Sequence, residues 1–129
     1  MATVSTTYFH GANGDTILKI MASGQLRPGK DNTIFLGRYS WESCMMHGPD
    51  RMRKASFVVK LVVGQVPDQR TIFRETHGVR DTAMIQTDQP IPVEVLELYV
   101  RTLDEDGIAS LNHIRGAESI KQYLGPARG

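Results

Sequence analysis

The chain has 129 residues, 40% of them hydrophobic, which is enough for one domain with a packed core, so we expect a single domain over residues 1–129. Its formal net charge of +1 excludes the global basic field of a dedicated nucleic-acid binder. The only cysteine, Cys44, excludes an intramolecular disulfide and a zinc site of several thiolates, and it fits a reducing cytosol.

The N-terminal residues Met1 to Ser5 lack the basic and apolar segments of a secretion signal, and no stretch approaches the length needed to span a bilayer. We therefore expect a cytoplasmic site of action. Delivery into a target cell would need a larger secreted protein that carries the chain.

The first elements expected are a strand and a helix. Thr6 to His10 is predicted as a short strand. Asp15 is the expected N-cap of an amphipathic helix over Thr16 to Ala22, and Gly24 is its expected end.

A loop from Gln25 to Asn32 is expected next, followed by a strand over Thr33 to Leu36. Ser40 is expected to cap a short helix that carries Trp41 and Cys44 at helical spacing. Cys44 lies on the apolar side of this helix, so packing is its expected role.

Ser56 to Val63 is the strongest strand signal, a β-branched and aromatic run interrupted only by Lys60, as in a central strand buried on both faces. Strands outnumber helices, so we expect an α+β domain with a split, mixed or antiparallel β-sheet core, short flanking helices and a central cleft between two small sheets. The later elements expected are strands over Arg70 to Glu75, Thr82 to Thr87 and Val93 to Thr102, and a helix over Ala117 to Leu124.

Three stretches of the chain resemble one enzyme family. They are Tyr8-Phe9-His10-Gly11, then Leu26-Arg27-Pro28-Gly29 with the strand Thr33 to Leu36, and Ile34 to Cys44 followed by Ser56 to Gly64. In order and spacing they resemble the ADP-ribosyltransferase superfamily, in the branch of diphtheria toxin, the poly(ADP-ribose) polymerases and the rifampin ADP-ribosyltransferases. The resemblance implies that family's split-sheet fold and NAD as co-substrate in a central cleft.

The resemblance assigns His10 to a ribose hydroxyl and the Gly11 main chain to the nicotinamide carboxamide, which a Cβ would obstruct. Phe35 falls on the family's strand tyrosine and keeps a ring for stacking without the hydroxyl, and Tyr39 is the alternative ring. The remaining candidates for NAD contacts are Arg27, Leu36, Arg38 and Ser40. The competing interpretations are structural: a strand end at His10, core packing at Phe35, helix packing at Tyr39 and Trp41, and solvated arginines.

The family's third element is an acidic or amide side chain at the start of the penultimate strand. No Glu lies between Val79 and Asp88. Asp81 is the first choice because it begins that strand, and Gln86 is the second as a neutral group that holds the ribose. In the rifampin-modifying relatives the acid follows the earlier central strand, which points to Asp68. In the polymerases, a Glu at this position supports elongation of the ADP-ribose chain. Its absence from this sequence therefore implies transfer of a single ADP-ribose unit.

We therefore expect a mono-ADP-ribosyltransferase of toxin or effector type that modifies a macromolecular acceptor, protein or nucleic acid, and has an immunity or antitoxin protein as a possible partner. The alternatives are a small-molecule (antibiotic) ADP-ribosyltransferase, an RNA 2′-phosphotransferase-like enzyme, a non-catalytic NAD- or ADP-ribose-binding module, and an interaction domain without a ligand. The four histidines are scattered without ligand spacing, so a metal site is not expected. The run Arg51 to Lys54, with Arg70, Arg74 and Arg80, has two interpretations: contact with an RNA or DNA backbone near the cleft mouth, or a solvated charged rim, which we favour.

Overall fold

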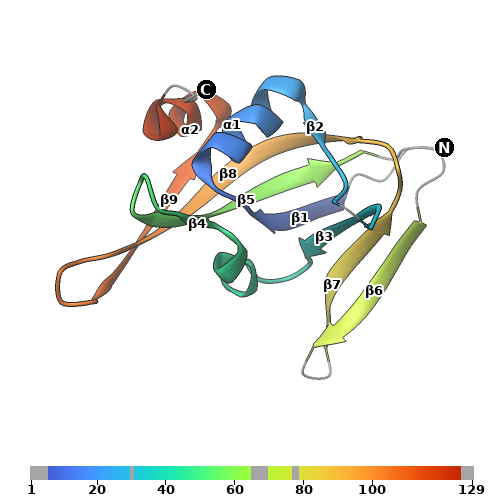
Figure 1. The fold of residues 1–129 in the computed structure, drawn as a ribbon, viewed down its shortest axis with the longest axis horizontal. Helices are drawn as coiled ribbons and strands as arrows, with labels where there is room; N and C mark the ends of the chain where they lie inside the picture. Colours follow the sequence, from blue (N-terminus) through green and yellow to red (C-terminus); the bar gives the residue numbers. More distant parts are fainter. Residues whose placement is uncertain (1–5, 30, 65–69, 77–78, 126–129) are drawn as a thin grey trace.

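The computed structural model describes residues 6–29, 31–64, 70–76 and 79–125 (Figure 1). Asp68, one of the candidate acids, lies outside the described residues. The elements in chain order are β1 (Thr6–Gly11), α1 (Gly14–Ser23), β2 (Gln25–Leu26), β3 (Thr33–Gly37), the 3-10 helix η1 (Glu42–His47), β4 (Pro49–Asp50), β5 (Ala55–Val63), β6 (Arg70–Thr76), β7 (Val79–Gln86), β8 (Ile91–Leu103), β9 (Ala109–Arg115) and α2 (Ala117–Leu124).

The described strands form one large antiparallel sheet of nine strands, so the expected α+β class is confirmed. Its order is β2-β8-β5-β1-β3-β7-β6, with β4 added beside β5 and β9 beside β8. Pairing is weakest between β1 and β3, where Phe9 with Gly37 is the only registered pair among the described residues, whereas β1 and β5 share six pairs. The two halves of the sheet therefore meet through a single residue pair.

β5 is buried on both faces, as its sequence predicts. Phe57, Val59 and Leu61 are fully buried in the main core, which α1 and α2 cover. Val58 points to the opposite face and packs with Cys44 and Met45 of η1. Figure 1 shows α1 and α2 side by side over β8. One face of the sheet thus carries both α-helices, and η1 covers part of the other.

α1 begins one residue after Asn13, whose Oδ1 accepts a hydrogen bond of 2.8 Å from the Thr16 N–H. The expectation that Asp15 caps this helix is wrong, because its carboxylate lies 2.9 Å from Arg53 instead. Gly24 ends the helix as expected, with a φ of 66° that favours glycine. α2 has its predicted bounds, and Ile120 on its inner face is fully buried.

Arg53 joins three parts of the chain. Its guanidinium donates to Asp50, to Asp15 and to the carbonyl oxygen of Leu124 at the end of α2. Asp50 also accepts a bond of 2.8 Å from the Gly14 N–H at the start of α1. We call Asp15, Asp50 and Arg53 the Arg53 cluster. The interpretation of Arg51 to Lys54 as a solvated rim is therefore wrong for Arg53, which is largely buried.

Burial alone would raise the pKa of Asp50. The hydrogen bonds from the Gly14 and Arg53 N–H groups, together with the Arg53 charge, outweigh burial and hold the pKa below its ordinary value. The Arg53 cluster thus fastens the turn that follows His10 and Gly11 to the loop before β5, and it depends on an ionised carboxylate.

Three other expectations need correction. The helix after Ser40 is 3-10 rather than α, and it begins at Glu42. Within the expected loop over Gln25 to Asn32, the first two residues form β2 and pair with β8. β9 was not expected, and together with β8 it forms a hairpin that projects from the body of the molecule (Figure 1).

Candidate functional site at the gap between β1 and β3

β1 and β3 meet at Phe9 and Gly37 and then part. Two residues further, the same register would bring Gly11 opposite Phe35. Instead, Nδ1 of His10 lies 3.2 Å from the Phe35 carbonyl oxygen. A carbonyl oxygen only accepts, so Nδ1 carries the proton and donates it, and Nε2 keeps a lone pair.

Burial lowers the pKa of His10. Its hydrogen bond to the Phe35 carbonyl opposes this, and the nearby charge of His47 lowers the pKa further. The net direction is downward, so the imidazole is neutral at pH 7. A neutral ring held through Nδ1 offers Nε2 as a fixed acceptor for a hydroxyl group.

Gly11 presents its main chain to the gap. The neighbouring Ala12 N–H donates to Phe57 on β5, so strand alternation turns the N–H and C=O of Gly11 toward the β3 side. The register of β1 with β3 contains Phe9 alone among the described residues. Gly11 therefore has a donor and an acceptor directed at a place without a strand partner.

The missing side chain of Gly11 also has a structural reason. A Cβ built there would collide with the main-chain carbonyl oxygen of Cys44 and approach the His47 Cβ to 3.1 Å. Cys44 is buried, as expected for a packing role, and burial raises the pKa of its thiol. Glycine at position 11 thus lets η1 lie against β1.

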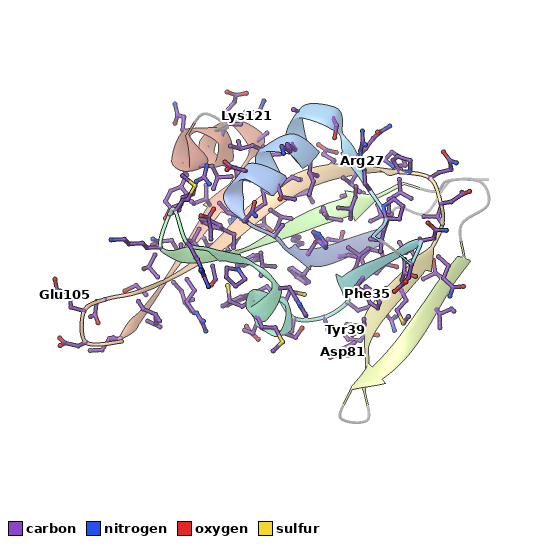
Figure 2. The ribbon with its side chains drawn as sticks, viewed as in Figure 1. Arg27, Phe35, Tyr39, Asp81, Glu105 and Lys121 are labelled. Carbon is purple, nitrogen blue, oxygen red and sulfur yellow. The ribbon has the colours of Figure 1, made fainter. Side chains whose placement is uncertain are left out.

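Phe35 is 51% exposed, although Ile34 and Leu36 on either side of it are buried. The interpretation of Phe35 as a core residue is therefore wrong. Tyr39 is 61% exposed, and the guanidinium of Arg38 lies 4.7 Å from the centre of its ring. In the view of Figure 2, Phe35, Tyr39 and Asp81 lie in the same region of β3 and β7. Both aromatic candidates are accessible to a ligand, and Phe35 lies on the sheet face opposite His10 because it alternates with Ile34 and Leu36 of the main core.

The two candidates on β7 lie on opposite faces of the sheet, because they are an odd number of residues apart. Asp81 alternates with the buried Ala83 and Ile85, which places it on the main-core face. His10 alternates with the buried Tyr8 and shares this face. Gln86 is exposed on the other face, roughly 17 Å along the strand from Asp81. Of the two, Asp81 shares the face of His10 by strand alternation, and its charge also acts on the Cys44 thiol.

Asp81 is joined to the loop after β3. Its carbonyl oxygen accepts a bond of 2.7 Å from the Arg38 N–H, and its Oδ1 accepts one of 3.2 Å from the Thr82 hydroxyl. The side chain is partly exposed. Asp81 therefore lies beside Arg38, at the end of the β3–β7 pairing that includes Gly37 and Thr82.

The other candidates are less well placed for side-chain contacts with a ligand. Leu36 is buried in the main core, so only its main chain is available. The Ser40 hydroxyl donates to the Glu42 carboxylate and accepts from the Glu42 N–H, which fixes the start of η1. Arg27 is exposed beside β2, away from Phe35 (Figure 2).

A second group of polar and aromatic residues lies on the η1 side of the sheet. The rings of Trp41, Tyr99 and His113 are stacked, and we call them the aromatic row. Trp41 and Tyr99 are 5.1 Å apart at 7°, and Tyr99 and His113 are 4.4 Å apart at 10°. Nε2 of His113 lies 2.9 Å from the Glu97 carboxylate.

Glu97 is surrounded by cations. Lys60 lies 3.3 Å and Arg115 3.2 Å from its carboxylate oxygens. Burial would raise the pKa of Glu97, but the hydrogen bond from Lys60 and the charges of Lys60, His113 and Arg115 hold it below its ordinary value. This group has no signal in the sequence, because its His113 and Arg115 lie on the unexpected strand β9.

A cavity lies beside each of the two clusters of polar residues named above. One of about 370 Å³ lies beside the Arg53 cluster and the end of α2. The other, of about 240 Å³, lies along the aromatic row and is lined by Trp41, Tyr99, Val100, Leu111, Asn112 and His113. Neither of these two cavities is lined by His10, Phe35 or Asp81.

No family model, curated protein or solved structure matches the chain. Among the described residues, no three His, Cys, Asp or Glu side chains are grouped closely enough to hold a metal ion. No helix in the described ranges has the length and apolar character needed to cross a membrane.

Proposed function

We propose that the chain is a mono-ADP-ribosyltransferase that binds NAD where β1 and β3 part. The observation that carries the proposal is the pairing pattern at this gap. His10 Nδ1 donates a hydrogen bond to the Phe35 carbonyl oxygen. The N–H and C=O of Gly11 point to a position without a strand partner. A primary carboxamide, such as that of nicotinamide, has the matching acceptor and donor.

The neighbouring residues suit the rest of the nucleotide. Nε2 of neutral His10 accepts a hydrogen bond from a ribose hydroxyl, which holds the sugar while positive charge develops on it. Phe35 supplies an accessible ring for the flat nicotinamide at the edge of the gap, on the sheet face opposite the His10 side chain, with Tyr39 as the second ring. Arg38, beside Tyr39, is the candidate donor to the diphosphate, because Arg27 lies away from Phe35.

In the proposed reaction, the bond between nicotinamide and C1′ of the ribose breaks, and nicotinamide leaves with the bonding electrons. A nucleophilic oxygen or nitrogen of the acceptor forms the new bond to C1′, and its proton passes to a base or to water. Asp81 is the proposed group beside the ribose because it shares a sheet face with His10. Its carboxylate stabilises the positive sugar and orients the acceptor.

The alternative is a module that binds NAD or ADP-ribose without turnover. The absence of a Glu on β7 favours it, because the shorter Asp81 side chain already accepts a hydrogen bond from Thr82. The two candidates agree on binding and differ in chemistry. A small-molecule acceptor in place of a macromolecule would not change the NAD site.

The test measures NAD binding by calorimetry and nicotinamide release by chromatography, with the protein alone and with cell lysate. For the transferase, His10→Ala abolishes release, and Phe35→Ala weakens NAD binding by at least about fivefold, since aromatic contacts of this kind contribute on the order of 1 kcal/mol.

Tyr123→Ala is the matched control for Phe35→Ala, because Tyr123 is an exposed aromatic residue of α2 at 45% exposure. It should leave binding unchanged. NAD binding without nicotinamide release identifies the binding module. If NAD does not bind, or if His10→Ala releases nicotinamide at the original rate, the proposal is wrong.

A further inference from the structure

The cavity along the aromatic row has the size and lining of a site for one planar ring. Its volume of about 240 Å³ is below the range of about 300–1,000 Å³ that is usual for drug-sized ligands. Trp41, Tyr99 and His113 contribute three stacked rings, and Leu111, 58% exposed, adds an apolar side chain. Such walls hold a flat heteroaromatic group through stacking and apolar contact.

Cations lie at both ends of this cavity. Strand register places Arg101 opposite Leu111 and Glu97 opposite Arg115, with Tyr99 and His113 paired between them. Residues two apart on a strand share a face, so Arg101, Tyr99 and Glu97 point to the same side. Arg101 is exposed at one end, and Arg115, at 77% exposure, stands at the other.

The local charge on this face is positive. Lys60, Arg101 and Arg115 are cations on this face, and the Glu97 carboxylate pairs with Lys60 and Arg115. Arg101 and Glu97 are four residues apart, about 13 Å along the strand. Aromatic rings flanked by cations over this length are the combination that binds single-stranded nucleic acid, in which the bases stack and the phosphates contact basic side chains.

We propose that this face binds single-stranded nucleic acid, with one base in the cavity of the aromatic row and backbone phosphates at Arg101 and Arg115. Its role as the acceptor site rests on the proposed transferase activity, whereas the binding itself does not. The acidic turn from Asp104 to Asp106 lies beyond Arg101 and repels phosphate, so the site covers only a few nucleotides.

Trp41 is the only tryptophan of the chain, so its fluorescence reports directly on the aromatic row. The experiment titrates the full chain, without NAD, with labelled tetranucleotides of RNA and of DNA and with free adenosine. Binding is followed by the anisotropy of the label and, with unlabelled oligonucleotide, by Trp41 emission. We expect binding of at least one oligonucleotide with quenching of Trp41, and weaker binding of adenosine because it lacks phosphates.

Variants separate stacking from charge. His113→Ala should weaken oligonucleotide binding at least about fivefold, whereas His113→Phe keeps a ring and should retain it. Arg101→Ala should reduce the slope of log affinity against log salt by about 0.7, the contribution of one phosphate contact on a single strand. Lys121→Ala removes the same charge from the exposed side of α2 and should leave the slope unchanged.

Two results would overturn the inference. One is no change in anisotropy for either oligonucleotide up to about 100 µM, the weak limit of non-specific binding. The other is binding that leaves Trp41 emission unchanged and is equally weakened by Arg101→Ala and Lys121→Ala, which indicates attraction by overall charge. Because NAD is absent throughout, neither result bears on the NAD site, which His10→Ala tests separately.

Discussion

Arg53→Met tests whether the Arg53 cluster holds the turn after Gly11 in place. Methionine keeps the aliphatic part of the side chain and removes the guanidinium, which donates to Asp50, Asp15 and the Leu124 carbonyl. Asp50, whose side chain is 5% exposed, then keeps only main-chain donors. The substitution leaves a buried carboxylate without its countercharge.

Removal of one partner from a buried ion pair costs about 3–5 kcal/mol. Arg53 is 19% and Asp15 27% exposed, so their contact is partly screened by water and belongs with the weaker surface pairs. We therefore expect the lower end, a loss of about 3 kcal/mol in the free energy of unfolding. The double substitution Asp50→Asn with Arg53→Met should recover part of this loss, since no uncompensated charge remains.

The assay is urea unfolding followed by circular dichroism at pH 7, with the slope against urea compared between variants. Lys121→Ala is the control, because its 3.9 Å pair with Glu118 is exposed and should change stability by less than about 0.5 kcal/mol. A loss of less than about 1 kcal/mol in Arg53→Met, at an unchanged slope, would refute the reasoning that this cluster fastens the turn.

Three other predictions follow from the same geometry. Folding lowers the pKa values of Asp50 and Glu97 below 3.8 and 4.5, so as the pH drops the unfolded chain binds protons before the folded chain does. Urea unfolding should therefore show a free energy of unfolding that decreases as the pH falls through these values. Gly11→Ala places a Cβ against the main-chain carbonyl of Cys44 and should cost about 1–3 kcal/mol in the same assay, so unaltered stability would contradict the packing of η1 on β1. The lowered pKa of His10 predicts that nicotinamide release persists below pH 6.5 and is lost only at lower pH, and an acid limb above 6.5 in the pH–rate profile would disprove a neutral acceptor.

The elements that sequence predicted well are those with a clear apolar pattern. β5 carries a nearly continuous apolar run because both of its faces are covered, and its expected bounds differ from the observed ones by one residue. α2 shows Ile120 and Leu124 at a spacing of four, and both are buried. In each case the pattern records burial directly, so it can be read from the chain alone.

The misses have long-range causes. β9 has no alternating pattern because its side chains are mostly exposed on both faces, and its pairing comes from β8. Asp15 is a good capping residue by type, but Arg53, 38 residues later in the chain, takes its carboxylate and leaves the cap to Asn13. Neither the β8–β9 pairing nor the Asp15–Arg53 contact can be predicted from neighbouring residues in the sequence, since each depends on a distant segment of the folded chain.

The same limit applies to the two sites in different degrees. His10, Gly11 and Phe35 stand out in sequence because their spacing resembles a known pattern, although only the structure shows that the sheet register stops between them. The aromatic row could not be predicted, because Trp41, Tyr99 and His113 come from three segments, one of them unexpected. Histidines that are scattered along a chain therefore become informative only once the strand pairing is known. Here the pairing of β8 with β9 places the imidazole of His113 against the Tyr99 ring and the Glu97 carboxylate.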